Sequence, residues 1–262
     1  MKLLCVYNIC GLSGRDNDQW YISAIQSLLN QNFDDFTIVV SSCLSKVSTI
    51  SNIKKSCPNV SINRLFDKLP VNLTFDHTIQ KTVEKFGEFE GYIYVDSGIH
   101  LEKQNDVFTK LYDLYKSGPY GMVVGRTNTD TGFPVWLGIG KHDNDSTSFN
   151  DFFHKHGHYI IPVGKAVNHH FQLWSNDLYK AYNNLWPDIW AAQASESVFS
   201  FLNAAINKKW IIHADVEVHH QTGLDVPSCG FSPVQWAMAG RPNYDYPFII
   251  DSILPRIENG LR

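Results

Sequence analysis

The stretch Tyr92-Ile93-Tyr94-Val95-Asp96-Ser97-Gly98-Ile99-His100 decides how this chain is interpreted. Its first four residues are β-prone and run directly into an aspartate, a serine and a glycine. A short, continuously apolar run is typical of a strand buried on both faces, as in the middle of a mostly parallel sheet. Ligands of open α/β sheets bind outside the carboxyl ends of such strands, where Asp96 would lie. Asp-Ser-Gly after a strand is also common as a plain turn, so both interpretations stay open.

Strands and helices alternate over the first hundred residues. Apolar runs before the central stretch predict strands at 3–7, 36–40 and 60–65. Apolar residues that recur at helical spacing predict helices at 20–29, 45–56 and 75–86. This alternation predicts a parallel sheet with right-handed crossovers.

The second half of the chain is less regular. Its expected helices lie at 105–116, 176–184 and 194–207. Its expected strands lie at 120–125, 135–137 and 210–218, with apolar runs at 159–163 and 167–173. Residues 126–151 are rich in Gly, Asn, Asp and Thr and are expected to form mainly loops.

Composition bounds the class of protein. The 262 residues are 44% hydrophobic and 13% aromatic, so the chain can bury a substantial core. Nucleic acid and membrane surfaces are negatively charged and attract proteins with an excess of positive charge. The net charge of −4 argues against binding of either partner through bulk charge. No apolar run approaches the roughly 20 residues of a transmembrane helix. We therefore expect a globular protein with no transmembrane segment.

The five cysteines, at positions 5, 10, 43, 57 and 229, are scattered and odd in number. No pair has Cys-x-x-Cys spacing, so reduced thiols are favoured over a disulfide framework or a zinc site. The start of the chain, residues 1–6, is too short for the apolar region of a signal peptide and predicts a first strand instead. These features indicate a cytoplasmic protein.

Taken in order, these pieces resemble the nucleotide-sugar glycosyltransferases with the GT-A fold. The helix containing 24–32 and the strand at 36–40 are similar to the Ser-Ile-x-Ser-x-x-x-Gln helix and second strand of that superfamily. Residues 90–98 resemble its metal-binding Asp-x-Asp strand. Ser195-Glu196-Ser197 lies where the family keeps its acidic catalytic base, and His219-His220 lies where many members place a histidine metal ligand.

The resemblance implies an α/β fold of GT-A type, with a mostly parallel Rossmann-like central sheet flanked by helices. It implies one domain over 1–262, with a nucleotide-sugar-binding half at 1–100 and an irregular acceptor-binding and catalytic half at 101–262. Three positions depart from the family pattern. Gly98 replaces the second aspartate of Asp-x-Asp, Ser41-Ser42 replaces an acidic residue, and Asp76-His77 stands where an Arg-Asn pair is usual.

The implied chemistry starts from a departing diphosphate, whose charge Mn²⁺ or Mg²⁺ would neutralise. Asp96 can supply one carboxylate ligand, and His219 or His220 a further one, since imidazole suits Mn²⁺ better than Mg²⁺. In an inverting transfer, a carboxylate takes the proton of the acceptor hydroxyl. Glu196 is the candidate for this base, with Asp188 in reserve. A glutamate in the first turn of a helix can also be there for the helix dipole alone.

The remaining site residues are implied contacts of the two substrates. Contacts with the nucleotide-sugar donor are expected from Tyr7, Asn8, Ser41, Ser42, Asp76, His77, Asp96 and Ser97. Contacts with a glycan or glycoprotein acceptor are expected from Trp136, Trp174 and Trp190, because aromatic faces suit sugar rings. Most tryptophans are nonetheless core residues, so few of these should touch a sugar.

Three functions remain open from the sequence. The first is a metal-dependent glycosyltransferase, probed by changing Asp96 and Glu196. The second is a glycoside hydrolase with two carboxylates, which needs no nucleotide. The third is a non-catalytic sugar- or nucleotide-binding relative, which Gly98 in place of an acid favours.

Overall fold

The computed structural model describes residues 2–10, 18–43, 45–65, 71–102, 104–127, 156–163, 170–184 and 195–220. The strands in these ranges are β1 (Leu3–Cys10), β2 (Phe36–Cys43), β3 (Ser61–Leu65), β4 (Gly91–Val95), β5 (Ile99–His100), β6 (Tyr120–Thr127), β7 (Tyr159–Ile160), β8 (Phe171–Ser175) and β9 (Lys209–His220). The helices are α1 (Asp18–Leu29), α2 (Val47–Ser56), α3 (Val71–Phe86), α4 (Val107–Lys116), α7 (Asn176–Asn184) and α8 (Ser195–Ala205).

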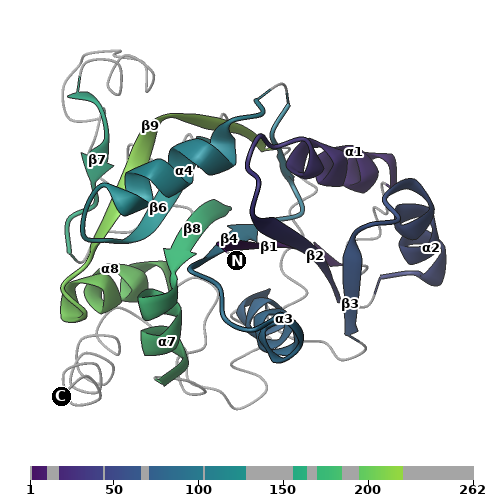
Figure 1. The fold of residues 1–262 in the computed structure, drawn as a ribbon, viewed down its shortest axis with the longest axis horizontal. Coiled ribbons are helices and arrows are strands. Elements are labelled where there is room, and N and C mark those ends of the chain that lie inside the picture. The colour runs from purple at the N-terminus through teal and green to yellow at the C-terminus, as the bar shows by residue number, and fades with distance from the viewer. Residues whose placement is uncertain are drawn as a thin grey trace, which may run out of the picture.

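One sheet runs through the described residues in the order β3-β2-β1-β4-β8-β6-β9-β5, with β7 paired to β9 (Figure 1). Strands β3, β2, β1 and β4 are all mutually parallel, whereas the short β5 pairs antiparallel with β9 at the other edge. Strand β8 is antiparallel to both of its neighbours, β4 and β6, while β6 and β9 are parallel. The α/β class with a largely parallel central sheet, expected from the alternation of strands and helices, is confirmed.

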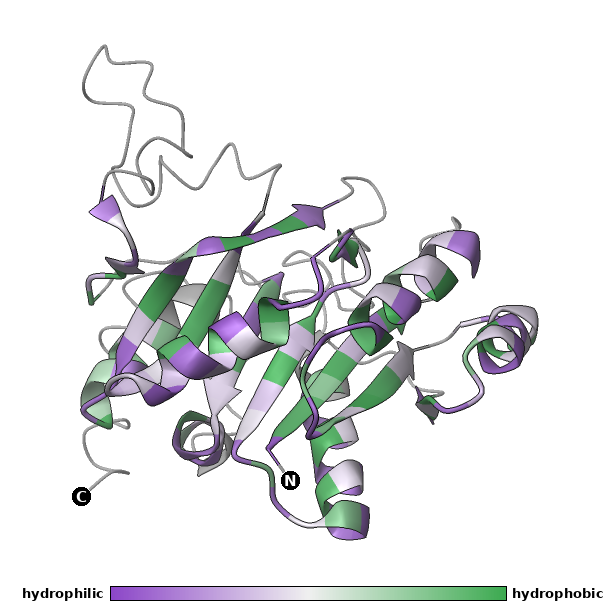
Figure 2. Ribbon diagram, turned by 45° about the horizontal axis from the view of Figure 1, so that its top comes forward, coloured by the Kyte–Doolittle hydropathy of each residue, from purple (hydrophilic) through white to green (hydrophobic). Residues whose placement is uncertain are grey.

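Apolar side chains cover both faces of the sheet, which explains why its central strands lack polar alternation. All five residues of β4 and all five of β8 are buried. One core packs α3, α7 and α8 against the face that carries Leu4 and Val6. The other packs α1, α2 and α4 against the face that carries Leu3 and Cys5. Figure 2 shows the result as hydrophobic strands between helices whose outer sides are hydrophilic.

Several boundaries differ from the sequence-based expectation. Ser41 and Ser42 lie within β2, which runs on to Cys43, and both serines are fully buried. His219 and His220 lie within β9 and do not follow it, because this strand pairs with β5 up to its last residue. The expected strand at 135–137 lies outside the described residues.

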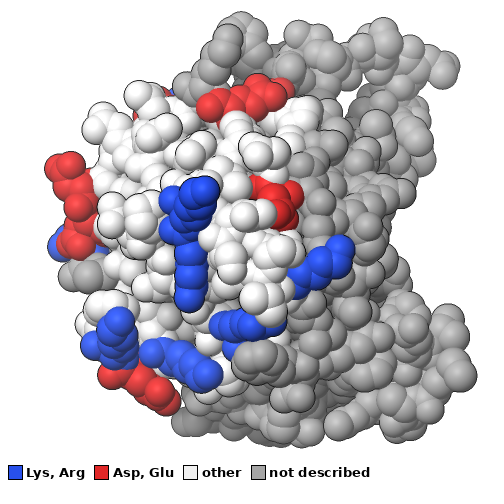
Figure 3. Space-filling model, turned by 90° about the vertical axis from the view of Figure 1, so that its right-hand side faces the viewer, with Lys and Arg blue, Asp and Glu red and all other residues white. Residues whose placement is uncertain are grey.

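Charge and thiols complete the description. The face on the side of α2 and β3 carries scattered acidic and basic side chains separated by uncharged surface (Figure 3). Cys5 and Cys57 are buried and unpaired, in line with reduced thiols. Across the described ranges, no helix combines the length and the apolar character needed to cross a membrane.

A buried histidine on β9 ties stability to pH. His213 is 5% exposed, and its Nδ1 accepts a hydrogen bond of 3.0 Å from the N–H of Asp215. The ring of His158 packs edge-on against it, with centroids 4.5 Å apart. Burial, with a smaller contribution from His158, lowers the pKa of His213 from 6.5 to about 4. The folded state therefore holds this imidazole neutral.

We expect the free energy of unfolding to fall as the pH drops from about 6.5 to about 4. Above this window both states carry a neutral His213, whereas within it only the unfolded state takes up the proton. At 1.36 kcal/mol per pKa unit, the loss approaches about 3 kcal/mol. Urea unfolding of the wild type and of His213→Leu over this pH range measures it. The variant should show a flatter pH dependence, and equal slopes in both proteins would contradict the assignment.

Candidate functional site

Three segments that are far apart in the sequence meet at the carboxyl end of β4. Asp96 follows this strand, His170 precedes β8, and His220 ends β9. Because β4 and β8 are antiparallel neighbours, the N–H of Asp96 donates to the carbonyl oxygen of His170 at 2.8 Å. His170 Nδ1 lies 3.1 Å from Asp96 Oδ2, and the rings of His170 and His220 stack with centroids 4.2 Å apart. One carboxylate and two imidazoles thus lie together.

The Asp96 carboxylate is held in its ionised form at the border of the core. Its side chain is 19% exposed, and burial alone raises its pKa. The hydrogen bond and charge of His170, the N–H of Ser97 and the charge of His220 outweigh burial, so the pKa lies below its ordinary value. Since a carboxylate only accepts, the proton between it and His170 belongs to Nδ1 of His170.

Asp96 also opens a tight turn. The N–H of Ile99 donates to the Asp96 carbonyl oxygen at 3.1 Å, and the N–H of Ser97 donates to Asp96 Oδ1 at 2.7 Å. The turn interpretation of Asp-Ser-Gly is therefore correct. It does not exclude a binding role, because the turn aims the carboxylate and leaves the charge at the sheet edge.

Two aromatic side chains fix this turn from below. The Tyr7 hydroxyl donates to the Ser97 carbonyl oxygen at 2.8 Å, and Trp20 Nε1 donates to the same oxygen at 2.9 Å. Tyr7 is fully buried, and burial raises its pKa well above the ordinary value. Its ring is therefore closed off from the nucleotide-sugar donor that was expected to contact it, and it positions the Asp96 turn instead.

A second polar group lies beside β1, β2 and β3. Thr78 on α3 donates to Ser41 Oγ at 2.8 Å, and Asn63 Nδ2 donates to Thr78 Oγ1 at 2.8 Å. His77 Nδ1 lies 3.5 Å from Asn63 Nδ2, and burial, followed by the charge of Lys81, lowers the pKa of His77. A neutral imidazole and several hydroxyl and amide groups therefore meet near the carboxyl ends of β2 and β3.

Asn8 connects the two polar groups. Its Nδ2 lies 3.4 Å from the carbonyl oxygen of Val95, one residue before Asp96, and its Cα is paired with Ser41 in the β1–β2 register. Asn8 Oδ1 is buried and has no hydrogen-bond partner among the described residues, and the same is true of Ser42 Oγ. Unfilled acceptors at this edge are suited to donors on a bound molecule.

Known sequence families and curated proteins give no match to this chain. Solved structures do. The mannosyltransferase PcManGT from Pyrobaculum calidifontis, in complex with GDP-Man and Mn²⁺, superposes with a TM-score of 0.60 at 12% identity over 99% of this chain and 69% of that one. S. aureus TarS 1–349 in complex with UDP-GlcNAc gives 0.56 at 14% identity over 99% and 72%. A further TarS structure gives 0.55 at 13% identity over 85% of this chain and 37% of that one.

This chain has the GT-A glycosyltransferase fold. The order of elements expected from that resemblance is confirmed, since β1, β2 and β4 form the parallel centre and Asp96 follows β4. The chain spans about two thirds of the mannosyltransferase and just over a third of the longer TarS structure.

Within this GT-A fold, the two adjacent histidines of β9 point to opposite sides. His220, 5% exposed, stacks on His170 beside Asp96. His219 Nδ1 lies 3.2 Å from Glu102 Oε1, and its ring packs near Trp20. Consecutive residues of a strand face opposite ways, so only one of them can share the Asp96 side. Of the two predicted histidines, His220 is the one brought to the carboxylate.

Two predicted site residues lie elsewhere in the GT-A domain. Trp174 was expected to contact an acceptor, but it is 2% exposed and packs in the core against Phe75 and Phe199, with ring centroids 5.2 and 4.7 Å away. Asp76 was expected to contact the donor, but it is 4% exposed and accepts hydrogen bonds from Tyr179 of α7 and from Gln80 of its own helix, α3. Each of these residues lies on the side of its strand or helix that packs into the interior.

The remaining predictions concern the second half. Helix α8 begins at Ser195, so Glu196 lies in its first turn as expected, although its side chain lies outside the described part of the molecule. Asp188, Trp136 and Trp190 also lie outside the described residues.

The side chains at Asp96 could hold a divalent cation only if a bound substrate supplied further metal ligands. Among the described residues, no three His, Cys, Asp or Glu side chains are arranged to hold a metal ion. Asp96 and one imidazole are a carboxylate and nitrogen pair, and ions such as Mg²⁺ and Mn²⁺ commonly complete such pairs with substrate phosphates. The site therefore fits a cation that arrives with, or is completed by, a diphosphate.

Several site residues were missed by sequence reasoning. His170, Trp20, Asn63 and Thr78 were assigned only to their helices, strands or apolar runs. The pair His169-His170 within the expected apolar run at 167–173 was the available signal for the first. The others carry no local signal, because their role depends on which elements lie beside them.

We expect Tyr7→Phe and Trp20→Phe to lower the free energy of unfolding by about 1 kcal/mol each, the usual net contribution of a hydrogen bond. The double variant should lose more than the sum, because it leaves the buried Ser97 carbonyl oxygen without either donor. Urea unfolding of the four proteins measures the coupling. Tyr115→Phe is a matched control, since its hydroxyl lies 3.5 Å from its acceptor. Strictly additive losses would contradict a shared role at Ser97.

Proposed function

We propose that this protein is a metal-dependent glycosyltransferase that moves a sugar from a nucleotide-diphosphate sugar to a hydroxyl of a glycan or glycoprotein. The observation that carries the proposal is the ionised Asp96 carboxylate beside the stacked imidazoles of His170 and His220, at the carboxyl end of β4 in a GT-A fold. The similar structures described above hold GDP-Man with Mn²⁺ in the mannosyltransferase and UDP-GlcNAc in TarS.

Asp96 and His220 are the proposed protein ligands of Mn²⁺ or Mg²⁺, with diphosphate oxygens completing the shell. When bound, the cation supplies electrostatic stabilisation of the departing diphosphate. His170 positions Asp96 through the 3.1 Å contact between Nδ1 and Oδ2. His219 remains a less favoured ligand, because Glu102 lies 3.2 Å from its Nδ1.

The nucleotide is proposed to lie over β1 and β2, where Asn8 and Ser41 meet the α3 face that carries His77. The unfilled acceptor Asn8 Oδ1 supports this placement. Ser42 faces the other side of the sheet, because consecutive residues of a strand alternate, and it is the less favoured contact. Ser97 contributes through its backbone, since its N–H and carbonyl oxygen shape the turn that carries Asp96.

Glu196 is the proposed base for an inverting transfer, with Asp188 in reserve. The first turn of α8 supports this role, since a carboxylate there can be aimed at an acceptor hydroxyl. Trp136 and Trp190 are the proposed acceptor contacts. We also propose that the transferred sugar is a hexose or a pentose. The proposed location of the protein is the cytoplasm.

A thermal-shift series with UDP-, GDP- and dTDP-sugars, each with and without Mn²⁺, tests donor binding. One donor at a hundred times its dissociation constant should raise Tm by about 5–10 °C, corresponding to about 2.7 kcal/mol. Asp96→Asn should lose the Mn²⁺-dependent part of this rise while keeping the turn, because an amide oxygen can still accept from Ser97. Asp35→Asn, an exposed change beside Lys2, is the matched control. The proposal fails if no donor shifts Tm.

Glu196→Gln tests the base. We expect the rate of sugar transfer to fall by about 10²–10⁴-fold with donor affinity unchanged, because the amide cannot take a proton. Glu84→Gln on the exposed side of α3 should behave as wild type. Transfer at the wild-type rate by Glu196→Gln would move the role to Asp188 or another group.

A non-catalytic binding relative is the second candidate. Gly98 in place of an acid and the lack of a three-residue ligand set in the described ranges favour it. It predicts a donor-induced rise in Tm with neither transfer nor donor hydrolysis. A glycoside hydrolase, the third class, predicts cleavage of glycosides without any response to nucleotide sugars.

A further inference from the structure

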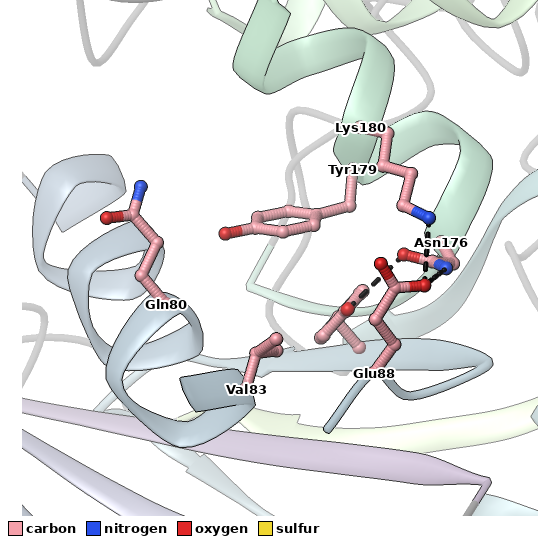
Figure 4. A pocket seen from close by; sticks show the side chains of 7 residues that line it. Gln80, Val83, Glu88, Asn176, Tyr179 and Lys180 are labelled. Carbon is pink, nitrogen blue, oxygen red and sulfur yellow. Dashed lines mark hydrogen bonds and ion pairs between the residues drawn. The ribbon is translucent and has the colours of Figure 1, made fainter. Parts of the chain in front are cut away.

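A pocket of about 240 Å³ opens at the amino end of β4, away from Asp96 (Figure 4). Its floor is formed by Val83 of α3, Tyr92 of β4 and Tyr179 of α7. Its rim is formed by Gln80, Glu88, Asn176 and Lys180. Apolar surface is thus surrounded by amide, carboxylate and ammonium groups.

The two tyrosine rings of the floor are held rigidly. Their centroids lie 4.5 Å apart at 46°, which packs Tyr179 on Tyr92. The Tyr179 hydroxyl donates to the buried Asp76 Oδ1 at 2.7 Å, and the Tyr92 hydroxyl donates to Asn176 Oδ1 at 3.3 Å. Both hydroxyls are therefore used within the protein. Tyr92 and Tyr179 are 1% and 6% exposed, so they present only a small carbon surface to the pocket.

The rim combines donors and acceptors without net charge. Glu88 Oε2 accepts from Lys180 Nζ at 2.8 Å and from Asn176 Nδ2 at 3.2 Å. Figure 4 shows the other carboxylate oxygen of Glu88 turned toward Tyr179. The hydrogen bond from Lys180, and then that from Asn176, lowers the pKa of Glu88, so this oxygen is an acceptor. Lys180, with a side chain 54% exposed, keeps further N–H groups for a ligand.

This combination selects a class of ligand. An aromatic floor suits the carbon face of a sugar ring. Hydroxyl groups both donate and accept, as the free Glu88 oxygen and the Lys180 ammonium require. An anionic ligand would be repelled at short range by the Glu88 carboxylate. A purely apolar ligand would remove water from the charged rim without replacing its hydrogen bonds. We propose that this pocket binds one neutral sugar ring.

The pocket is separate from the proposed cation site at Asp96, and the proposal does not depend on transfer activity. Tyr92 and Asp96 are four residues apart along β4, which corresponds to about 13 Å at about 3.3 Å per residue. The pocket also lies between α3 and α7, on the face away from Tyr7 and Trp20. A glycan in the pocket would therefore lie at a distance from the Asp96 edge.

Saturation-transfer NMR with methyl glycosides of glucose, galactose, mannose and N-acetylglucosamine, without nucleotide or metal, tests the proposal. At least one glycoside should show transfer from the wild type, and soaked crystals should show its ring against Tyr179. The double variant Glu88→Gln, Lys180→Ala should bind it at least ten-fold more weakly. Both side chains are exposed, at 59% and 54%, so the variant should fold.

The matched control is Asp106→Asn, Lys110→Ala, which removes a comparable ion pair of 2.9 Å on α4. It should bind the glycoside as wild type does. The proposal is overturned if no glycoside shows transfer, if the rim variant binds as well as the control, or if a saturating nucleotide sugar displaces the glycoside. Tighter binding of methyl glucuronide than of methyl glucoside would overturn the neutral-sugar assignment.

Discussion

A carboxylate kept ionised at the border of a hydrophobic core is the constraint on which the functional edge of this protein depends. Burial alone would favour the protonated form of Asp96, and the neighbouring N–H groups and imidazoles reverse that preference. Those groups come from Ser97 and His170, whose backbone is itself fixed by Tyr7, Trp20 and the β4–β8 ladder. The charge is thus a property of the surrounding fold as much as of one residue.

The two ends of β4 have different chemistry. At the carboxyl end, the Asp96 carboxylate and two imidazoles form a group that is suited to a cation with a diphosphate. At the amino end, Glu88 is compensated by Lys180, and the tyrosine rings dominate. The five-residue strand between them is buried throughout. Its length separates the two proposed binding sites, one at each end.

Local patterns predicted much of the architecture. The strands at 36–40 and 92–95 and the helices at 20–29 and 176–184 were found close to their expected bounds, because apolar period and turn residues act over short distances. The errors concern strand ends, which depend on pairing with neighbouring strands. β2 and β9 run further than expected, since Ser42 and His220 gain ladder partners that their own polarity does not reveal.

The sequence by itself determined the α/β class, the order of elements and the position of Asp96 after a buried strand. It could not decide between His219 and His220, find His170, or place Trp174 and Asp76 in the interior. Those outcomes depend on β8 inserting antiparallel between β4 and β6 and on the face that each strand or helix presents. The physical reason is that a side chain's type is local, whereas its neighbours across a sheet come from segments about 75 to 125 residues away, brought together only when the two cores pack.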